Sequence, residues 1–183
     1  MGPPRIGGVP GGVVPPGETA PAGNFASAMR SAYGAKENRI CQHPATIVVD
    51  VANVMGSRPD GWWRDRAAAA VRLHAQIAAL AASSAAGGRP ILPDETDPPE
   101  FVLVLEGAAR AAAARIGTES AADGRVRVVP ADGSGDDAIV ALVRELSGRR
   151  FVVTADRELR NRCVAAGAEV LRPGWLLGLL REP

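Results

Sequence analysis

The fold is decided by the stretch Thr46–Asp50, which has the sequence TIVVD. Its apolar residues follow one another without polar alternation, and such a run is typical of a strand that is buried on both faces. Four further apolar runs that predict strands follow it, at residues 101–105, 126–129, 151–154 and 169–171. Because helical segments separate these runs, we expect a parallel sheet with helices on both of its faces.

Five segments have the spacing or the composition of helices, at residues 65–82, 108–116, 136–146, 157–166 and 175–180. In the first of them, Leu73, Ile77 and Leu80 share one face, which we expect to pack against the sheet. His74 is expected on the opposite, polar face. The segment 83–100 contains repeated glycines and prolines and is predicted to be a long loop.

The composition of the chain excludes several classes of protein. Its 183 residues are 46% hydrophobic and carry a net charge of +1. The length suits one ordinary domain, and the near-neutral charge produces no field that would by itself attract nucleic acid or a membrane. No apolar run approaches the roughly 18 residues of a membrane helix, and two cysteines are too few for a disulfide framework. We therefore expect a soluble, cytoplasmic domain that makes no contact with a membrane.

The first 44 residues differ from the rest of the chain. They are rich in glycine and proline and have no sustained apolar period, so burial cannot offset the entropy of ordering them. We predict that residues 1–44 form a disordered extension and that residues 45–183 form the folded domain. The folded part carries 17 basic and 18 acidic residues.

Acidic side chains follow three of the predicted strands, and two more open a predicted helix. They are Asp50 after the first strand, Glu106 after the second, Asp156 after the fourth, and the pair Asp136 and Asp137. The carboxyl ends of parallel strands meet at one edge of a sheet, where ligands bind. We therefore expect these carboxylates to lie together.

Carboxylates that crowd together need a positive partner, because they repel one another and are costly to bury unpaired. Arg157 is the nearest arginine to this edge. A hard divalent cation, Mg²⁺ or Mn²⁺, is the natural partner because it prefers oxygen ligands. One alternative stays open: Asp136, Asp137 and Asp156 stand at helix starts and would cap those helices without any metal.

Sequence motifs for other kinds of site are absent. The chain has no P-loop, no glycine-rich dinucleotide motif after a strand and no G-x-S-x-G turn. His43 and His74 stand alone, and Cys41 and Cys163 lack the spacing of metal ligands. We expect Cys163 to lie in the core.

Three motifs resemble the NYN branch of the PIN-like ribonucleases, and within it the YacP-like group. Val49–Val54 (VDVANV) resembles the D-x-x-N start of that family, Ser134–Ala138 (SGDDA) resembles its acidic pair at a helix start, and Thr154–Leu159 (TADREL) resembles its T-x-D-x-x-L segment. Glu106 occupies the place of the family's acid after the second strand, which is often Asp in relatives. The likeness spans residues 46–176.

The resemblance implies a three-layer α/β/α fold whose parallel sheet has about five strands in the order 3-2-1-4-5. It also implies a Mg²⁺ or Mn²⁺ site and the hydrolysis of RNA. The predicted catalytic residues are Asp50, Asn53, Glu106, Asp136, Asp137 and Asp156. All of them except Asn53 are predicted metal ligands, and Asp50, Asp136 and Asp156 are expected closest to the ion. Asn53 is expected to orient Asp50 or to donate to a phosphate.

The segment Gly56–Arg66 leaves the same edge of the sheet and combines arginines with two adjacent tryptophans. Aromatic faces and guanidinium groups suit single-stranded RNA. We predict that RNA is contacted by Asn53, Arg58, Trp62, Arg64 and Arg157. Two alternatives stay open: the tryptophans Trp62 and Trp63 would pack over the long helix, at least one of them buried, and Arg157 would pair with an acid.

Three functions are compatible with these features. The first is a metal-dependent endoribonuclease. The second is a PIN-like module that binds RNA or a protein and cleaves little or not at all. The third is a metal-dependent phosphoester enzyme that acts on nucleotides. The slight negative charge of residues 45–183 favours a substrate recruited by metal over binding by affinity alone. The sequence indicates no particular oligomeric state.

Overall fold

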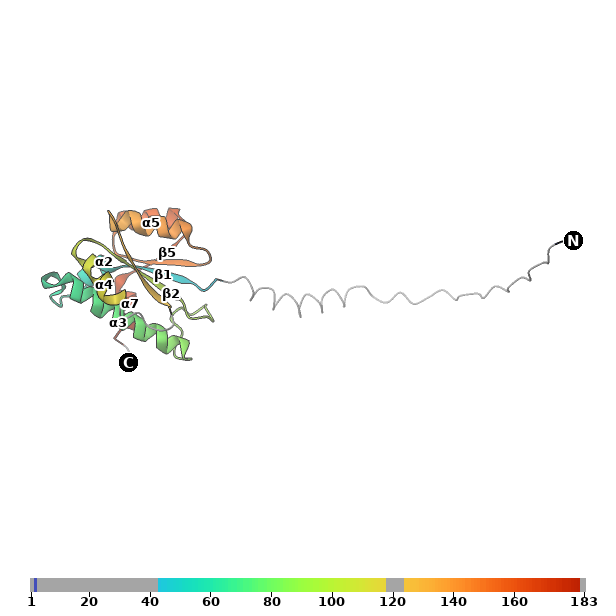
Figure 1. Ribbon diagram of the computed structural model, residues 1–183, viewed down its shortest axis with the longest axis horizontal. Helices are drawn as coiled ribbons and strands as arrows, with labels where there is room; N and C mark the ends of the chain where they lie inside the picture. Colours follow the sequence, from blue (N-terminus) through green and yellow to red (C-terminus); the bar gives the residue numbers. More distant parts are fainter. Residues whose placement is uncertain (1, 3–42, 118–123, 182–183) are drawn as a thin grey trace. The chain divides into compact units, whose positions relative to one another are not determined.

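The computed structural model describes Gly2 and the ranges 43–117 and 124–181. The predicted disordered extension, residues 1–44, therefore lies almost entirely outside the described residues. The described chain contains a five-stranded parallel sheet in the order β3-β2-β1-β4-β5. Figure 1 shows this sheet with α5 on one side and α3 on the other. Its strands are β1 (Thr46–Asp50), β2 (Glu100–Leu105), β3 (Val126–Pro130), β4 (Arg150–Val153) and β5 (Glu169–Leu171). The strand order that the family resemblance implies is confirmed.

Helices connect the strands. They are α2 (Val51–Gly56), α3 (Arg66–Ala85), α4 (Ala112–Gly117), α5 (Gly135–Glu145), α6 (Arg157–Ala165) and α7 (Pro173–Leu179), with the 3₁₀ turns η1 (Trp62–Arg64) and η2 (Gly107–Ala111). Four of the five predicted helices are present within three residues of their expected bounds, and the fifth, predicted at residues 108–116, is divided into η2 and α4, which begins at Ala112. α2 and η1 were not predicted. No helix in the described ranges is long and apolar enough to cross a bilayer.

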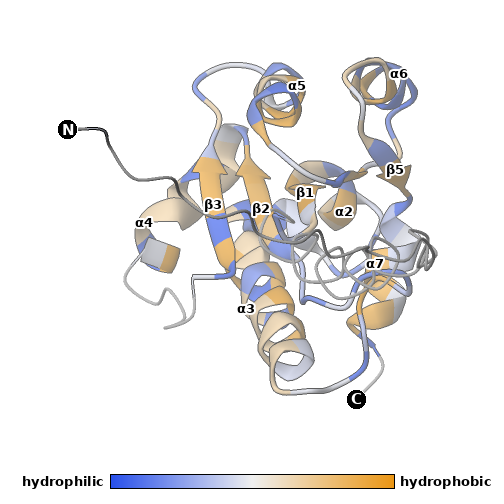
Figure 2. Cartoon of the chain, turned by 90° about the vertical axis from the view of Figure 1, so that its right-hand side faces the viewer, coloured by the Kyte–Doolittle hydropathy of each residue, from blue (hydrophilic) through white to orange (hydrophobic). Residues whose placement is uncertain are grey.

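Both faces of the sheet are covered, which gives three layers (Figure 2). Ile47 and Phe101 belong to the core beneath α2, α3, α4 and α7. Val48 and Val102, each the next residue in its strand, belong to the core beneath α5 and α6. Successive side chains of a strand point to opposite faces, and each such side chain contributes roughly 1.5–3 kcal/mol when it is fully buried. The continuous apolar runs therefore supply both cores at once.

The two edge strands are less buried than their sequences suggest. β1, β2 and β4 are buried along almost their whole length, as predicted. In β3, Arg127 is exposed and Val128 is only partly buried, and in β5 Glu169 is exposed. The expectation of burial on both faces is wrong for these strands, because an edge strand has a neighbour on one side only.

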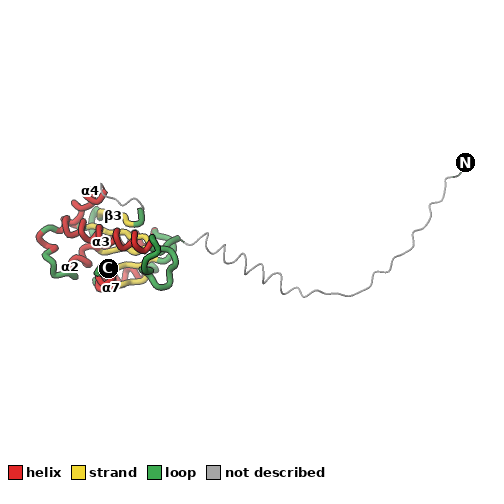
Figure 3. The backbone as a smooth tube through the Cα atoms, turned by 90° about the horizontal axis from the view of Figure 1, so that it is seen from below, coloured by secondary structure: helices red, strands yellow, loops and turns green. Residues whose placement is uncertain are grey.

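α3 is buried over a wider face than its spacing indicates. Figure 3 views the molecule from the side on which α3 and α7 lie. α3 contacts the sheet and also contacts η2 and α4. His74, which we expected on the polar face, is only 5% exposed. That prediction is wrong because His74 lies four residues after Ala70 and three before Ile77, and so on the buried face of α3.

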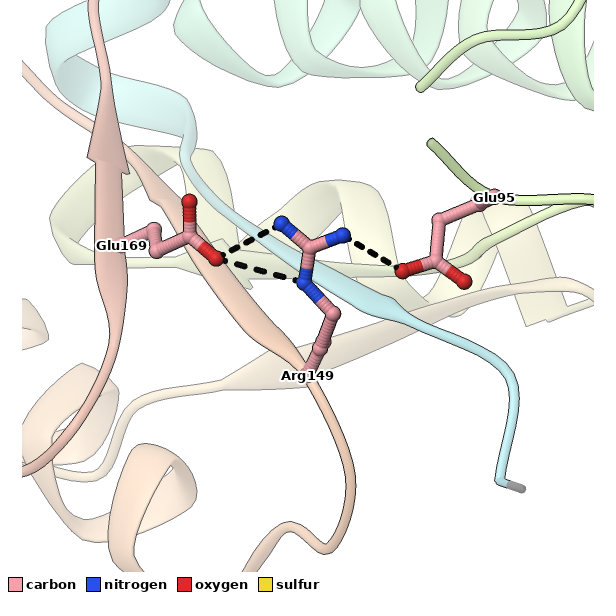
Figure 4. Close-up of polar contacts among 3 residues, drawn as sticks. All are labelled: Glu95, Arg149 and Glu169. Carbon is pink, nitrogen blue, oxygen red and sulfur yellow. Dashed lines mark hydrogen bonds and ion pairs between the residues drawn. The ribbon is translucent and has the colours of Figure 1, made fainter. Parts of the chain in front are cut away.

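The long loop between α3 and β2 is held at the amino ends of the strands. Ile91 and Leu92 are buried in the core. Arg149, directly before β4, forms ion pairs of 2.8 Å with Glu95 of the loop and with Glu169 of β5 (Figure 4). These contacts fix the loop at the edge of the sheet opposite the predicted carboxylate site.

Candidate active site

β1 passes directly into α2 at Asp50. The Asp50 side chain is the N-cap of α2, because its Oδ1 accepts a hydrogen bond of 3.1 Å from the Asn53 backbone N–H. Such a cap typically stabilises a helix by about 1 kcal/mol. The D-x-x-N motif thus turns the central strand into a helix without a loop. It also fixes the Asp50 carboxylate, with Asp50 only 8% exposed, at the carboxyl end of the sheet.

Thr154 holds the same carboxylate from the other side. Its buried hydroxyl donates a hydrogen bond of 2.9 Å to Asp50 Oδ2. The Thr154 Oγ1 also accepts a hydrogen bond of 3.1 Å from the Asp156 backbone N–H. The T-x-D motif therefore ties the end of β4 to the end of β1, and it leaves the Asp50 carboxylate a single orientation.

Asn53 and Asp156 complete this link. Asn53 Oδ1 accepts a hydrogen bond of 3.1 Å from the Ala155 N–H, so the side-chain NH₂ of Asn53 is left as a donor. Asp156 caps α6, because its Oδ1 accepts a hydrogen bond of 2.7 Å from the Leu159 N–H. The capping role considered for Asp156 is therefore real, and it occupies one of the two carboxylate oxygens.

Glu106 follows β2 and reaches the start of α5. Its Oε2 accepts a hydrogen bond of 3.0 Å from the N–H of Gly135, the buried first residue of α5. A Cβ on residue 135 would lie 2.5 Å from Glu106 Oε2 and 3.3 Å from Glu106 Cβ. Glu106 approaches α5 this closely because Gly135 has no side chain.

These residues surround one open pocket of about 440 Å³. Its lining consists of Asp50, Ala52, Asn53, Gly56, Ser57, Glu106, Asp136 and Asp156. Four carboxylates, each from a different segment of the chain, meet there, and none of the lining residues is basic. The structure therefore brings together five of the six predicted catalytic residues.

Burial and mutual repulsion raise the pKa of two of these carboxyls. The pKa of Asp50 is raised above 3.8 chiefly by burial, and the charges of Asp136 and Glu106 add to the effect. The hydrogen bonds to Asp50 oppose it. The pKa of Asp136 is raised by burial and by the charges of Asp156 and Glu106. Negative charge is thus costly in the pocket, and a bound cation would relieve that cost.

The pocket contains carboxylate oxygens that suit a metal ion, but these side chains are not arranged around a common point. Within the described ranges, no group of three or more His, Cys, Asp or Glu side chains is arranged to hold a metal ion. Among these same residues, hydrogen bonds reach neither Glu106 Oε1, nor Asp156 Oδ2, nor the Asp136 carboxylate. Mg²⁺ is commonly held by one or two carboxylates and several waters. The donors present fit that mode of binding.

Asp137 lies outside the pocket. Its side chain is 72% exposed and forms an ion pair with Arg162 of α6. Consecutive helix residues point about 100° apart, so Asp136 and Asp137 face different ways from the start of α5. The structure therefore does not place Asp137 where we predicted a metal ligand. Arg162 was missed because its position depends on the packing of α5 against α6, which no local motif encodes.

Two of the predicted RNA-contacting arginines, Arg58 and Arg157, directly follow residues that line the pocket. Arg58 is partly buried and donates a hydrogen bond of 3.0 Å to Gln76 Oε1. Arg64 and Arg157 are exposed. Within the part of the chain that the structure describes, Arg157 takes part in no ion pair, so the alternative in which it neutralises an acid is not observed.

The two tryptophans form the turn η1. Trp62 is partly buried and packs against the core on the α3 side, and the Arg66 guanidinium lies 5.2 Å from the centroid of its ring. Trp63 is 57% exposed. The expectation that at least one tryptophan is buried is met only in part, because Trp62 keeps some exposure.

Comparisons with known proteins concern the fold. No family model and no curated protein matches the sequence. A solved structure of a single-substitution mutant of Rae1 (YacP) from Bacillus subtilis matches with a TM-score of 0.50 and 16% sequence identity, over 74% of this chain and 73% of that chain. YacP is also the name of the group that the sequence motifs resemble. The chain therefore has the YacP-like fold that its motifs imply.

Proposed function

We propose that the protein is a metal-dependent endoribonuclease that hydrolyses single-stranded RNA. The observation that carries this proposal is the convergence of Asp50, Glu106, Asp136 and Asp156 on one open pocket whose lining contains no basic residue. Such a pocket would repel an anionic ligand by itself, whereas a divalent cation bound to the carboxylates would attract a phosphodiester. The YacP-like fold supports the proposal, since the motifs that resemble a ribonuclease family lie at this pocket.

The four carboxylates differ in how the protein holds them for the proposed reaction. A Mg²⁺ or Mn²⁺ ion bound in the pocket would polarise the scissile phosphate and supply an activated water. Asp50 is fixed by two hydrogen bonds, so it needs no reorganisation to present its charge. Glu106 and Asp156 each present one oxygen to which no described residue donates. Asp136 is the most adaptable, because no described residue donates to its carboxylate.

Asn53 serves both the pocket and the substrate. Its backbone N–H orients Asp50 and its Oδ1 fixes the Ala155 loop. The remaining side-chain NH₂ group is a donor, and we assign it to a non-bridging oxygen of the phosphate. Loss of this donor alone is expected to slow cleavage without releasing Asp50, because the backbone bond persists.

Exposed aromatic and basic side chains next to the pocket suit single-stranded RNA. A Cβ on Gly56, which lines the pocket, would lie 3.8 Å from Cζ2 of Trp62. The turn η1 thus adjoins the pocket, with Trp63 and Arg64 exposed on it. Unpaired bases stack on aromatic rings and on guanidinium planes, whereas the bases of a duplex are not accessible in this way.

The proposal is tested with a circular single-stranded RNA, which only an endonuclease can open. We expect linear products with Mn²⁺ or Mg²⁺, none with a chelator, and slower cleavage of the same sequence in a duplex. Attack by water with departure of the 3′ oxygen leaves 5′-phosphate and 3′-hydroxyl ends. Cyclic 2′,3′-phosphate ends that form equally well in chelator would refute the metal-dependent reaction.

A second function is favoured by one observation. Because no three potential ligands in the described residues are arranged around an ion, a PIN-like module that binds RNA or a protein without cleaving is the alternative. It predicts that RNA binds and that the circle stays closed at every metal concentration. Binding and cleavage measured on the same circle distinguish the two functions.

A Gly135→Ala substitution is expected to displace Glu106 while the domain stays folded. The new methyl group lies closest to Glu106 Oε2, at the end of a flexible side chain, and it also lies 3.3 Å from Glu106 Cβ, so the Glu106 side chain has to turn away. Alanine favours a helix over glycine by about 1 kcal/mol. We expect a nearly unchanged melting temperature and a loss of cleavage of roughly ten- to a hundredfold. Gly174→Ala is the matched control, since a Cβ in the first turn of α7 meets nothing within 4 Å. An equal loss of cleavage in both variants would contradict this role of Gly135.

A further inference from the structure

Three arginines from separate elements gather beside α2. Arg58 follows α2, Arg72 lies in α3 and Arg181 follows α7. Arg58 donates a hydrogen bond to Gln76, which lies four residues after Arg72 and so on the same face of α3. Gln76 also lines a groove together with Leu180, the residue before Arg181. These contacts, together with the effect of the Arg72 and Arg181 charges on Arg58, place the three arginines around one region of the surface.

No ion pair among the described residues neutralises the positive charge of this arginine cluster. Arg72 and Arg181 are exposed. Partial burial and the charges of Arg181 and Arg72 lower the pKa of Arg58, while the charge of Asp60 opposes them. Like charges held close together repel one another, and a bound anion removes that repulsion.

The arginine cluster adjoins the carboxylate pocket along the chain. Gly56 and Ser57 line the pocket, and Arg58 is the next residue. α2, whose N-cap is Asp50, also contacts both α3 and α7. One short helix therefore separates the negatively charged pocket from the positively charged arginine cluster. This arrangement suits a polyanion that places one phosphate at the metal in the pocket and another at the arginine cluster.

On the basis of the function proposed above, we infer that Arg58, Arg72 and Arg181 bind backbone phosphates of the RNA strand on one side of the scissile bond. Guanidinium groups contact phosphate oxygens in bidentate fashion. Phosphate contacts of this kind position a strand without reading its bases. The substrate is thus a strand that continues from the pocket across α3 and the end of α7, and its sequence matters little there.

The test measures binding of a single-stranded RNA of about 16 nucleotides in a chelator, so that no cleavage occurs. For Arg72→Ala/Arg181→Ala we expect affinity to fall about tenfold at moderate salt. The slope of log affinity against log salt should become shallower by about 0.7 for each lost contact. Arg72→Lys/Arg181→Lys retains the charge and should retain most of the slope.

A charge-matched control is available on the other face of the sheet. Arg144 of α5 and Arg160 of α6 are exposed, and Arg144→Ala/Arg160→Ala should bind RNA as the wild type does. All of these side chains are exposed, so equal melting temperatures are expected and show that each variant is folded.

The outcomes separate the inference from the proposed function. If the alanine pair at the arginine cluster keeps the wild-type affinity and salt slope, the inference is overturned, and cleavage by the wild type still supports the function. If the wild type neither binds nor cleaves RNA, both fail. Binding of poly-aspartate as tightly as RNA, with the same dependence on Arg72 and Arg181, would assign the cluster to an acidic protein partner and overturn the inference.

Discussion

Asp50→Asn is expected to lower RNA cleavage by roughly two to three orders of magnitude and to leave the metal-free protein at least as stable as the wild type. The amide has the shape of the carboxylate. Its oxygen can still accept the Asn53 N–H, and its NH₂ can donate to Thr154 Oγ1 after the hydroxyl turns away. The change removes a buried charge that Asp136 and Glu106 repel. An amide is a poor ligand for a hard cation, so cleavage is lost.

The same variant has a signature in the pH dependence of stability. Because the pKa of Asp50 is raised in the folded state, the stability that its protonated form contributes is present below the ordinary value of 3.8 and is lost as pH rises through the folded-state pKa. Asparagine does not titrate, so part of this decline should disappear in Asp50→Asn. Asp136 has the same sign and should retain its own share.

A structural role for Asp50 predicts the opposite result. If its carboxylate serves mainly to satisfy the Asn53 N–H and the Thr154 hydroxyl, the substitution weakens both hydrogen bonds and destabilises the metal-free protein. Thermal unfolding of both proteins from acid to neutral pH, with a chelator present, measures the difference. A variant that is less stable at neutral pH, yet gains the wild-type increment from Mn²⁺, would remove Asp50 from the ligand set.

Mn²⁺ and Mg²⁺ are expected to raise the melting temperature of the wild type substantially. A ligand at 100 times its dissociation constant adds about 2.7 kcal/mol to the free energy of unfolding, which corresponds to roughly 5–10 °C for a domain of this size. The gain follows from the four carboxylates, whose repulsion a cation relieves. Thermal unfolding across a millimolar titration checks it.

Two controls make this measurement specific to the pocket. The double variant Asp50→Asn/Asp136→Asn should lose most of the increment, because it removes the two carboxylates whose pKa is raised. Asp137→Asn also removes one negative charge, but Asp137 lies outside the pocket. This variant should therefore keep the increment. A wild-type melting temperature that stays constant across the titration would contradict a metal site in the pocket.

The fold was predictable from the sequence because its three central strands are short and mostly apolar. β1, β2 and β4 are buried on both faces. Their sequences therefore show no alternation of apolar and polar residues, and this pattern is recognisable without the structure. α2 was not predicted, because Val51–Gly56 continues the apolar character of β1 and contains residues of low helix propensity. Its start depends on the Asp50 cap and on packing against α3 and α7, which are tertiary effects.

The candidate site was predictable where it depends on topology and not where it depends on side-chain direction. Parallel strands deliver Asp50, Glu106 and Asp156 to one edge, whatever the details of packing. The choice between Asp136 and Asp137 depends on how α5 is rotated about its axis, and the sequence has equal charges at both positions. The ion pair of Asp137 with Arg162 resolves that choice.

This pair of neighbouring acids also gives the most direct test of the carboxylate pocket as a nuclease site. Cleavage of a circular single-stranded RNA with Mn²⁺ is compared for Asp136→Asn and Asp137→Asn, two variants with the same change of charge at adjacent positions. Asp136→Asn should lose cleavage by at least about a hundredfold, while Asp137→Asn should stay within a few-fold of the wild type. Equal losses in the two variants, or full cleavage by Asp136→Asn, would contradict the assignment of the reaction to this pocket.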